Sequence, residues 1–283
     1  MDASDAAAPE PALFFALGVP KSGTTWVERA LNAHPEVVCK GEGKFHYFRD
    51  RLADAGKTYN AFMTERNMRV FGEAVFPRLN IDEVDAVFKA FVETRMRRDG
   101  PFPGARRLGC KDPDFGLYIE EYAALFPDID YVHIIRDPRD TALSMLRHME
   151  RVHPEVRFPS IEASLKDTAL GWRNYITSVR AETERHGLSC LEFTYEAMKA
   201  DPQAALGRVF EFLGVDASPT VVAACVAATR FERLSQGRQP GQEDRSSFYR
   251  RGVAGGWRDE LSAAQAELIL EAAGPIAAEL GYR

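Results

Sequence analysis

Five short runs rich in β-branched and aromatic residues alternate along the chain with stretches of helical periodicity. The runs are LFFALGV (13–19), EVVCK (36–40), RRLGCK (106–111), DYVHIIRD (130–137) and SCLEFTYE (189–196). Several of them are apolar almost throughout, which is typical of parallel strands whose two faces are both covered. The alternation predicts a doubly wound α/β fold, with a mainly parallel sheet and helices on both faces.

The length of 283 residues fits one large domain with a well-buried core. We expect a short disordered leader at residues 1–11, because this acidic, Ala/Pro-rich stretch lacks the basic and apolar regions of a signal peptide. A single domain then covers residues 12–283. Residues 50–100 have a mostly helical pattern and predict an insertion, whereas residues 235–249 are polar with Gly and Pro and predict a lid-like loop.

The composition narrows the class of protein. A formal net charge of −6 argues against a nucleic-acid binder that relies on a basic surface. No apolar run is long enough to span a bilayer. The four cysteines lie far apart without zinc-site spacing, and we interpret them as thiols of a reducing compartment. We therefore expect a cytoplasmic enzyme with no metal, nucleic-acid or membrane partner. A homodimer stays open, because it needs only a short surface patch.

The stretch GVPKSGTTW follows the first predicted strand and opens a helix. Gly18 and Gly23 have the spacing of the nucleoside-triphosphate loop G-x-x-x-x-G-K-[ST], but Thr24 stands at the lysine position and the lysine comes earlier, at Lys21. The loop amides and the hydroxyls of Thr24 and Thr25 are expected to converge on an anion at the positive end of the helix. The displaced lysine favours a nucleotide whose single 5′-phosphate carries another transferable group. A plain strand–helix turn is the alternative.

A second candidate anion site is IIRDPRDTALS (134–144), which spans a strand end and a helix start. Asp137 is expected to cap the helix and Pro138 to occupy its first turn. Arg136 would then project at the carboxyl edge of the sheet, where α/β proteins bind ligands, with Ser144 about two turns further on. Taken alone, Arg136 fits an ordinary strand-end ion pair equally well.

Together, PKSGTTW, IIRDPRDTALS and the late stretch FYRRGVAGGWRDEL (248–261) resemble the sulfotransferases that use 3′-phosphoadenosine 5′-phosphosulfate (PAPS). The resemblance covers residues 13 to about 262 and implies a P-loop sulfotransferase domain of the bacterial, cytosolic type. It also implies PAPS as donor, adenosine 3′,5′-bisphosphate (PAP) as product, and no metal. Lys21 would neutralise charge on the oxygen between phosphorus and sulfur as that bond breaks.

The resemblance also implies which side chains contact the nucleotide. Trp26 and Phe248 are candidates for packing on adenine, with simple core packing as the alternative. Arg136 and Ser144, with three residues of the late stretch, would contact the 3′-phosphate. The implied donor site consists of Lys21, Ser22, Gly23, Thr24, Thr25, Trp26, Arg136, Ser144, Tyr195, Thr229, Phe231, Phe248, Arg250, Arg251 and Gly252.

The resemblance implies more than one candidate for the general base, because members of the family use different residues. Members that sulfate small phenols carry a histidine where GCKDPDFG has Pro113, although Lys111 is kept and would orient the acceptor or the sulfonyl oxygens. Glycan-type members instead use an acidic residue after the first helix, which makes Glu42 in KGEGKFHYF our first choice and His46 our second. One overlay puts Lys44 at that acidic position. Two further acidic candidates are Asp112 and Asp114.

We therefore expect transfer of a sulfonate group to a hydroxyl, or an amine, of a small-molecule acceptor by in-line displacement. The acceptor site should be built from residues 42–70, the region after Ser144 and the loop 235–249. Four residues, Phe45, His46, Tyr47 and Phe48, would give it a partly aromatic lining. The alternatives are a P-loop nucleotide or small-molecule kinase, which would need magnesium, and a member that binds the nucleotide without catalysis.

Overall fold

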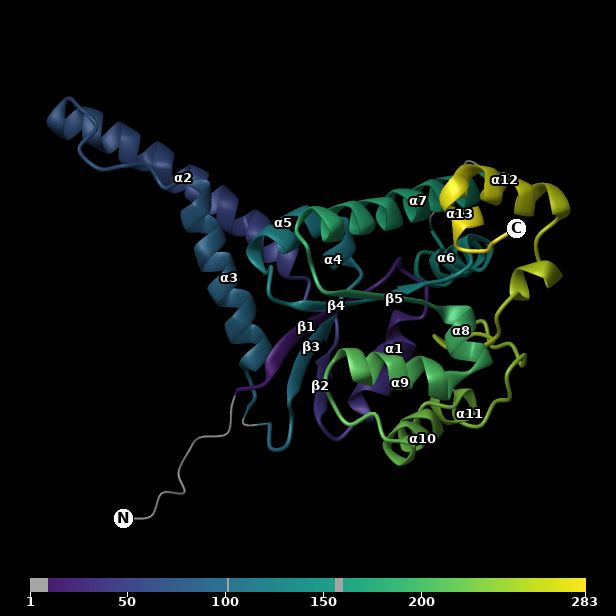
Figure 1. Cartoon of the computed structure of the whole chain (residues 1–283). Helices are drawn as coiled ribbons and strands as arrows, with labels where there is room; N and C mark the ends of the chain where they lie inside the picture. The colour runs from purple at the N-terminus through teal and green to yellow at the C-terminus, as the bar shows by residue number, and fades with distance from the viewer. Residues whose placement is uncertain (1–9, 101, 156–159) are drawn as a thin grey trace, which may run out of the picture.

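The computed structural model describes residues 10–100, 102–155 and 160–283 (Figure 1). At its centre is a five-stranded sheet with the order β2-β3-β1-β4-β5, in which every neighbouring pair is parallel. The strands are β1 (Ala12–Leu17), β2 (Val37–Lys40), β3 (Arg107–Lys111), β4 (Asp130–Ile135) and β5 (Cys190–Thr194). Each lies within one of the five predicted runs or begins one residue before it. Most of the expected leader lies outside the described residues.

Helices cover both faces of the sheet, so the doubly wound fold is confirmed. Phe14 and Phe15 on β1 are both fully buried but belong to different cores, because successive side chains of a strand point to opposite faces. One core involves α1 (Thr24–Asn32), α8 (Tyr195–Ala200), α9 (Pro202–Phe212) and α10 (Pro219–Ala228). The other involves α4 (Asp114–Leu117), α5 (Ile119–Leu125), α7 (Ile161–Arg185) and α13 (Pro275–Glu279).

A third, smaller core lies beside the sheet, where α6 (Pro138–Val152), α7 and α12 (Ala263–Ala273) pack against one another. Asp137 caps α6 by accepting a hydrogen bond from the amide of Arg139, and Pro138 is the first helical residue, as predicted. The short α11 (Phe231–Leu234) and the 3-10 helix η1 (Gly256–Asp259) flank the long loop that contains residues 235–249.

Two long helices, α2 (Phe45–Phe71) and α3 (Ile81–Arg97), form a hairpin that projects from the body of the molecule (Figure 1). The inner part of α3 is anchored, because Phe88, Val92 and Met96 belong to the core on one face of the sheet. The outer part extends away from the sheet. This hairpin, which we call the arm, occupies the region where the sequence predicts a helical insertion.

The sheet brings the two predicted anion motifs together. β1 and β4 are neighbours, with Phe14 opposite Asp130 and Leu17 opposite His133. The loops that follow them therefore leave the same carboxyl edge side by side, which is where open α/β sheets bind ligands. In the part of the chain that the structure describes, no helix is long and apolar enough to cross a membrane.

Candidate active site

The loop between β1 and α1 is shaped by its two glycines. Gly23 has a φ of 99°, and a Cβ there would lie 2.7 Å from the ring of Tyr195. A Cβ on Gly18 would lie 2.4 Å from the carbonyl oxygen of Ile134. Lys21 also has a left-handed backbone, with a φ of 77°. A non-glycine residue in that region carries strain, and such strain is concentrated at functional sites.

This loop presents hydrogen-bond donors to an anion. α1 begins at Thr24 without a side-chain cap, so the amides of Thr24 and Thr25 in its first turn remain available to a ligand. The amide of Ser22 does not, because it donates to the carbonyl of Val19 at 2.9 Å, and our expectation that all the loop amides converge on the anion is wrong at this position. The buried Ser22 hydroxyl has no partner among the described residues.

The Lys21 side chain lies within the cavity above this loop, with its ammonium 4.7 Å from the ring centroid of Phe248. Its pKa is lowered to about 8, mainly because burial removes solvent from the charged form. The nearby positive charges of Arg151 and Arg136 lower the pKa further. A cation held in this way is stabilised by an arriving anion.

Arg136 connects three segments of the site. Its guanidinium donates to the carbonyl of Lys21 at 3.3 Å and to that of Val253 at 3.0 Å, and it lies 4.4 Å from the ring centroid of Tyr195. The side chain is 13% exposed, and its Nε is buried without a partner in the described part of the chain. The indole of Trp172 donates to the Arg136 carbonyl, which fixes the backbone at the end of β4.

The late segment is held over the sheet edge by Asp140 in α6. This carboxylate accepts the amide of Gly255 at 2.6 Å and that of Trp257 at 3.0 Å. Gly252 has a φ of 63°, and a Cβ there would lie 2.1 Å from the ring of Phe231. Asp140 is not among the site residues that the sequence predicts. It stands inside the RDPRD motif and lies 3.5 Å from Arg136 of the same motif, but the two amides that it holds are more than a hundred residues away.

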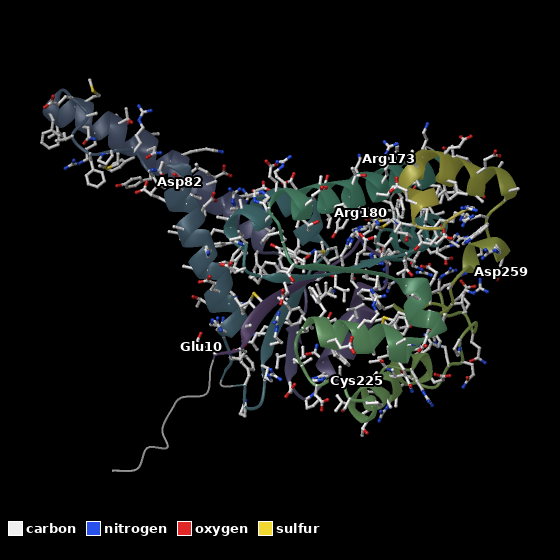
Figure 2. All side chains as sticks on the ribbon, viewed as in Figure 1. Glu10, Asp82, Arg173, Arg180, Cys225 and Asp259 are labelled. Atoms are coloured by element: carbon white, nitrogen blue, oxygen red, sulfur yellow. The ribbon has the colours of Figure 1, made fainter. Side chains whose placement is uncertain are left out.

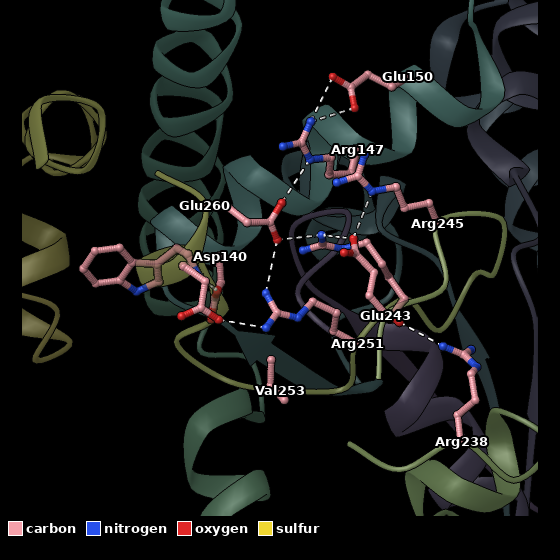
Figure 3. Close-up of polar contacts among 12 residues, drawn as sticks. Asp140, Arg147, Glu150, Arg238, Glu243, Arg245, Arg251, Val253 and Glu260 are labelled. Atoms are coloured by element: carbon pink, nitrogen blue, oxygen red, sulfur yellow. Dashed lines mark hydrogen bonds and ion pairs between the residues drawn. The ribbon is translucent and has the colours of Figure 1, made fainter. Parts of the chain in front are cut away.

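Arg250 and Arg251 lie on the cavity wall, but both are paired with carboxylates. Arg250 donates to Glu243 at 2.8 Å and to Glu260 at 2.6 Å, while Arg251 donates to Asp259 at 2.8 Å. Figure 3 shows Glu260 between the guanidinium groups of Arg147 and Arg251. The two arginines would have to exchange these partners in order to wrap a phosphate as the resemblance implies.

These segments enclose one cavity of about 820 Å³. It reaches from the β1–α1 loop to the late segment, and α6 contributes Met145, His148 and Met149 to its lining. Of the implied donor site it brings together every residue except Ser22: Lys21, Gly23, Thr24, Thr25, Trp26, Arg136, Ser144, Tyr195, Thr229, Phe231, Phe248, Arg250, Arg251 and Gly252. Glu42 lines it as well, whereas His46 and Lys111 do not.

Glu42 is held by two lysines. Lys111, only 4% exposed, donates to its Oε1 at 2.9 Å and also contacts Glu28 at 3.4 Å. The Nζ of Lys44 lies 3.0 Å from its Oε2. Burial opposes ionisation, but the hydrogen bonds from the two lysines outweigh it and lower the pKa of Glu42 below its ordinary value. Glu42 is therefore ionised near neutral pH.

Lys44 is the centre of a wider cluster that sequence reasoning did not find. Besides Glu42, its ammonium contacts Asp112 at 3.0 Å and Asp114 at 3.1 Å. The backbone of Lys44 is left-handed, with a φ of 46°, and its amide donates to the second carboxylate oxygen of Asp112 at 2.8 Å. Asp112 is 1% exposed and so depends on these donors. The two outlying acidic candidates for the base are therefore ion-paired.

The expected aromatic lining from residues 45–48 is wrong for this cavity. Phe45 lies in the core, and His46 is buried against the ring of Tyr118 with its Nε2 3.4 Å from Asp50. Phe48 stacks on Phe91, while Tyr47 is 66% exposed. The cause is helical phase, because α2 begins at Phe45 and turns its first residues towards the core and then towards solvent.

The cavity wall from α6 includes a histidine that the sequence motifs do not predict. His148 follows Ser144 by one turn of the helix, so both side chains project from the same face. Burial lowers the pKa of His148, and the nearby charges of Lys21 and Arg151 lower it further. Within the described residues no group of three or more His, Cys, Asp or Glu side chains is arranged to hold a metal ion.

Comparison with known proteins gives consistent matches. The sulfotransferase family model matches residues 11–219. Protein-tyrosine sulfotransferase 2 of Gallus gallus is 29% identical over 216 residues, which are 75% of this chain and 54% of that protein. The nodulation protein NoeE of Sinorhizobium fredii is 23% identical over 286 residues, covering 97% of this chain and 67% of that protein. The chain thus spans about half of the length of the first of these relatives.

Solved structures share the fold over almost the whole chain. Mouse sulfotransferase SULT7A1, complexed with PAP, has a TM-score of 0.57 and 19% identity, over 93% of this chain and 84% of that one. The sulfotransferase domain of the Synechococcus PCC 7002 olefin synthase has a TM-score of 0.53 and 20% identity, over 96% of each chain.

Proposed function

The chain belongs to the sulfotransferase family, and we propose that it transfers the sulfonate group of PAPS to a hydroxyl of a small-molecule acceptor. The observation that carries the proposal is the make-up of the cavity. Two partly buried cations, Lys21 and Arg136, line it together with an ionised carboxylate, Glu42. This is the arrangement that an anionic donor and a proton-bearing acceptor would require.

The residues at the donor end fit a nucleotide with two separate phosphate-bearing groups. At the β1–α1 loop, the Ser22 hydroxyl is buried without a partner in the described part of the chain, and the first-turn amides of α1 are uncapped. At the second position, the Nε of Arg136 is similarly unpartnered, and Ser144 lines the same cavity. Lys21 and the first-turn amides would hold the 5′ group, and Arg136 with Ser144 the 3′-phosphate.

PAPS would supply a sulfonate joined to the 5′-phosphate through a bridging oxygen. In the proposed step, Glu42 accepts the proton of the acceptor hydroxyl while a new O–S bond forms. The bond from sulfur to the bridging oxygen breaks, and its electron pair remains on the 5′-phosphate. Lys21 and the loop amides stabilise the charge that develops there. Catalysis is then mainly positioning and charge stabilisation.

The contacts of Glu42 support the role of base. Each carboxylate oxygen accepts one lysine contact and keeps further lone pairs for the acceptor. Lys111 is too buried to line the cavity and would act through Glu42, as a positioning residue. His148 lines the cavity as well and would contact the acceptor.

A tyrosine side chain of a protein is the second candidate acceptor. Several relatives are protein-tyrosine sulfotransferases, and the match to the Gallus gallus protein covers three quarters of this chain. Both candidates are hydroxyl acceptors, so the chemistry proposed for Glu42 and Lys21 is the same. They differ only in the size of the group that must reach the cavity.

The test is chromatographic detection of PAP formed from PAPS in the presence of a panel of phenols, alcohols and tyrosine-containing peptides. We expect PAP formation with at least one acceptor class, and we expect Glu42→Gln to abolish it while leaving PAP binding intact. His46→Ala, at a buried position outside the cavity, is the matched control and should keep the activity of a folded protein. Undiminished activity of Glu42→Gln would show that another group is the base.

A further inference from the structure

The outer end of the arm carries an unusual amount of exposed apolar surface. We call residues 59–81 the arm tip: the last turns of α2, the connecting loop and the first residue of α3. Eight large apolar side chains there are each 43% to 60% exposed. They are Tyr59, Phe62, Met68, Val70, Phe71, Val75, Phe76 and Ile81.

In this region α2 exposes its large apolar side chains and buries small or polar residues. Beyond its first two residues, the residues that the helix buries are Gly56 and Asn67, while aromatic side chains such as Tyr59 and Phe62 point outwards. A surface helix of a monomeric protein turns its apolar stripe towards the core. A helix that turns it to solvent is expected to be covered by another molecule.

The arm tip is nevertheless built by specific contacts. The side-chain amide of Asn60 donates to the backbone carbonyl of Leu79 at 2.8 Å and accepts a hydrogen bond from the backbone N–H of Leu79 at 2.7 Å. Asn80 and Glu83 then form a capping box that starts α3. The exposed rings are therefore presented by a fixed hairpin, and their side chains stand clear of the body of the molecule (Figure 2).

The size of this surface matches one side of a stable interface. Because a buried aromatic ring covers about 150–250 Å², four half-exposed rings and four smaller side chains leave roughly 700 Å² of apolar area. The largest apolar patch on a typical monomer is about 300–600 Å². Each partner in a standard protein–protein interface contributes about 800 Å².

The charges of the hairpin favour a second copy of the chain over a membrane surface or a nucleic acid. Residues 59–83 contain three arginines and four acidic residues, close to balance and interleaved along the hairpin. An acidic membrane surface or a nucleic acid would select an excess of positive charge. A second copy of the chain presents the same balanced set of charges, and a two-fold axis can place the arginines of one copy opposite the carboxylates of the other.

We propose that the arm tip is a homodimer interface, in which the hairpins of two copies pack against each other as a four-helix arrangement. The arm projects from the body in the view of Figure 1, so two arms can meet without the sheets colliding. This inference does not depend on the proposed function. The dimer would bury Phe62 and Phe76, at 60% and 58% exposed, as its central side chains.

The test is the mass in solution by sedimentation velocity at low-micromolar concentration. We expect the wild-type chain to have twice the monomer mass and the double variant Phe62→Asp/Phe76→Asp to have half of the wild-type value. Ile161→Asp places the same charge on a 47% exposed residue of α7 in the body and should leave the dimer intact. Circular dichroism and PAP binding confirm that each variant is folded.

Three results would overturn the proposal. The first is a wild-type chain that stays monomeric up to tens of micromolar. The second is a dimer that survives the double substitution in a folded protein, which would place the interface elsewhere. The third is a monomer that co-sediments with phosphatidylserine vesicles through Phe62 and Phe76, which would assign the arm tip to lipid.

Discussion

The lowered pKa of Lys21 predicts how donor binding depends on pH. In the free protein this pKa is about 8, because the ammonium is buried and faces the positive charges of Arg151 and Arg136. The phosphates of PAP are almost fully ionised above pH 7, since the second pKa of a phosphate ester is about 6. Lys21 is then the group near the donor that changes charge between pH 7 and pH 9.

The size of the effect follows from that pKa. Between pH 7 and pH 9 the protonated fraction of Lys21 falls from about nine tenths to about one tenth. If the ammonium is required to hold the 5′ group, the Kd of PAP rises about tenfold over this range, or ~1.4 kcal/mol. Lys21→Arg keeps a charge at all these pH values, so its Kd should be nearly constant.

The assay is calorimetric titration with PAP at pH 7, 8 and 9 at constant ionic strength. Near pH 8, binding should take up about half a proton, which appears as a dependence of the measured enthalpy on the buffer. A wild-type affinity that is flat between pH 7 and pH 9, or a Lys21→Arg variant that loses affinity with the same slope as the wild type, would refute this role of Lys21.

Two further substitutions test the architecture of the site. Gly252→Ala should lower both the melting temperature and the affinity for PAP, because the left-handed backbone costs about 1–2 kcal/mol and the new Cβ would lie 2.1 Å from the ring of Phe231. Gly241 is also left-handed but has open space around it, so Gly241→Ala should lower only the melting temperature. Equal losses of PAP affinity in the two variants would contradict this expectation. Lys44→Met should reduce the free energy of unfolding by about 1–3 kcal/mol, because the substitution removes a cation from the buried Asp112. The loss is limited because the Lys44 side chain is half exposed and its charge is screened by solvent. Lys44→Met should also raise the pKa of Glu42, so that the acid limb of kcat/KM moves to higher pH. Lys44→Arg should keep both the stability and the pH profile of the wild type. An acid limb that does not move in Lys44→Met would show that Glu42 is not the base.

The anion-binding half of the site could be predicted from sequence because its signals are local. A glycine-shaped turn followed by an uncapped helix, or an arginine at a strand end, is determined by a few consecutive residues. Lys21 and Arg136 therefore lie where the motifs place them, at the carboxyl ends of adjacent strands. The strand boundaries were also accessible, because buried parallel strands are apolar on both faces.

The acceptor half depends on contacts between distant segments, which sequence alone does not give. Lys44 contacts Asp112 across 68 positions, and nothing in the KGEGK stretch indicates that its second lysine gathers three carboxylates. The role of residues 45–48 was mispredicted because the phase of α2 turns them away from the cavity. Similarly, the ion pair between Arg250 and Glu260 depends on how the late segment folds, which the sequence does not give.

If the proposed function is right, the cavity recognises a nucleotide with separate 3′- and 5′-phosphates rather than a polyphosphate. The most direct measurement is calorimetric titration of PAP against ADP and ATP without magnesium, with Ser144→Ala as the variant at the 3′-phosphate position. We expect a strong preference of the wild-type chain for PAP, and a loss of about 1 kcal/mol for PAP but not for ADP in Ser144→Ala. A preference for ATP, or binding that requires magnesium, would contradict it.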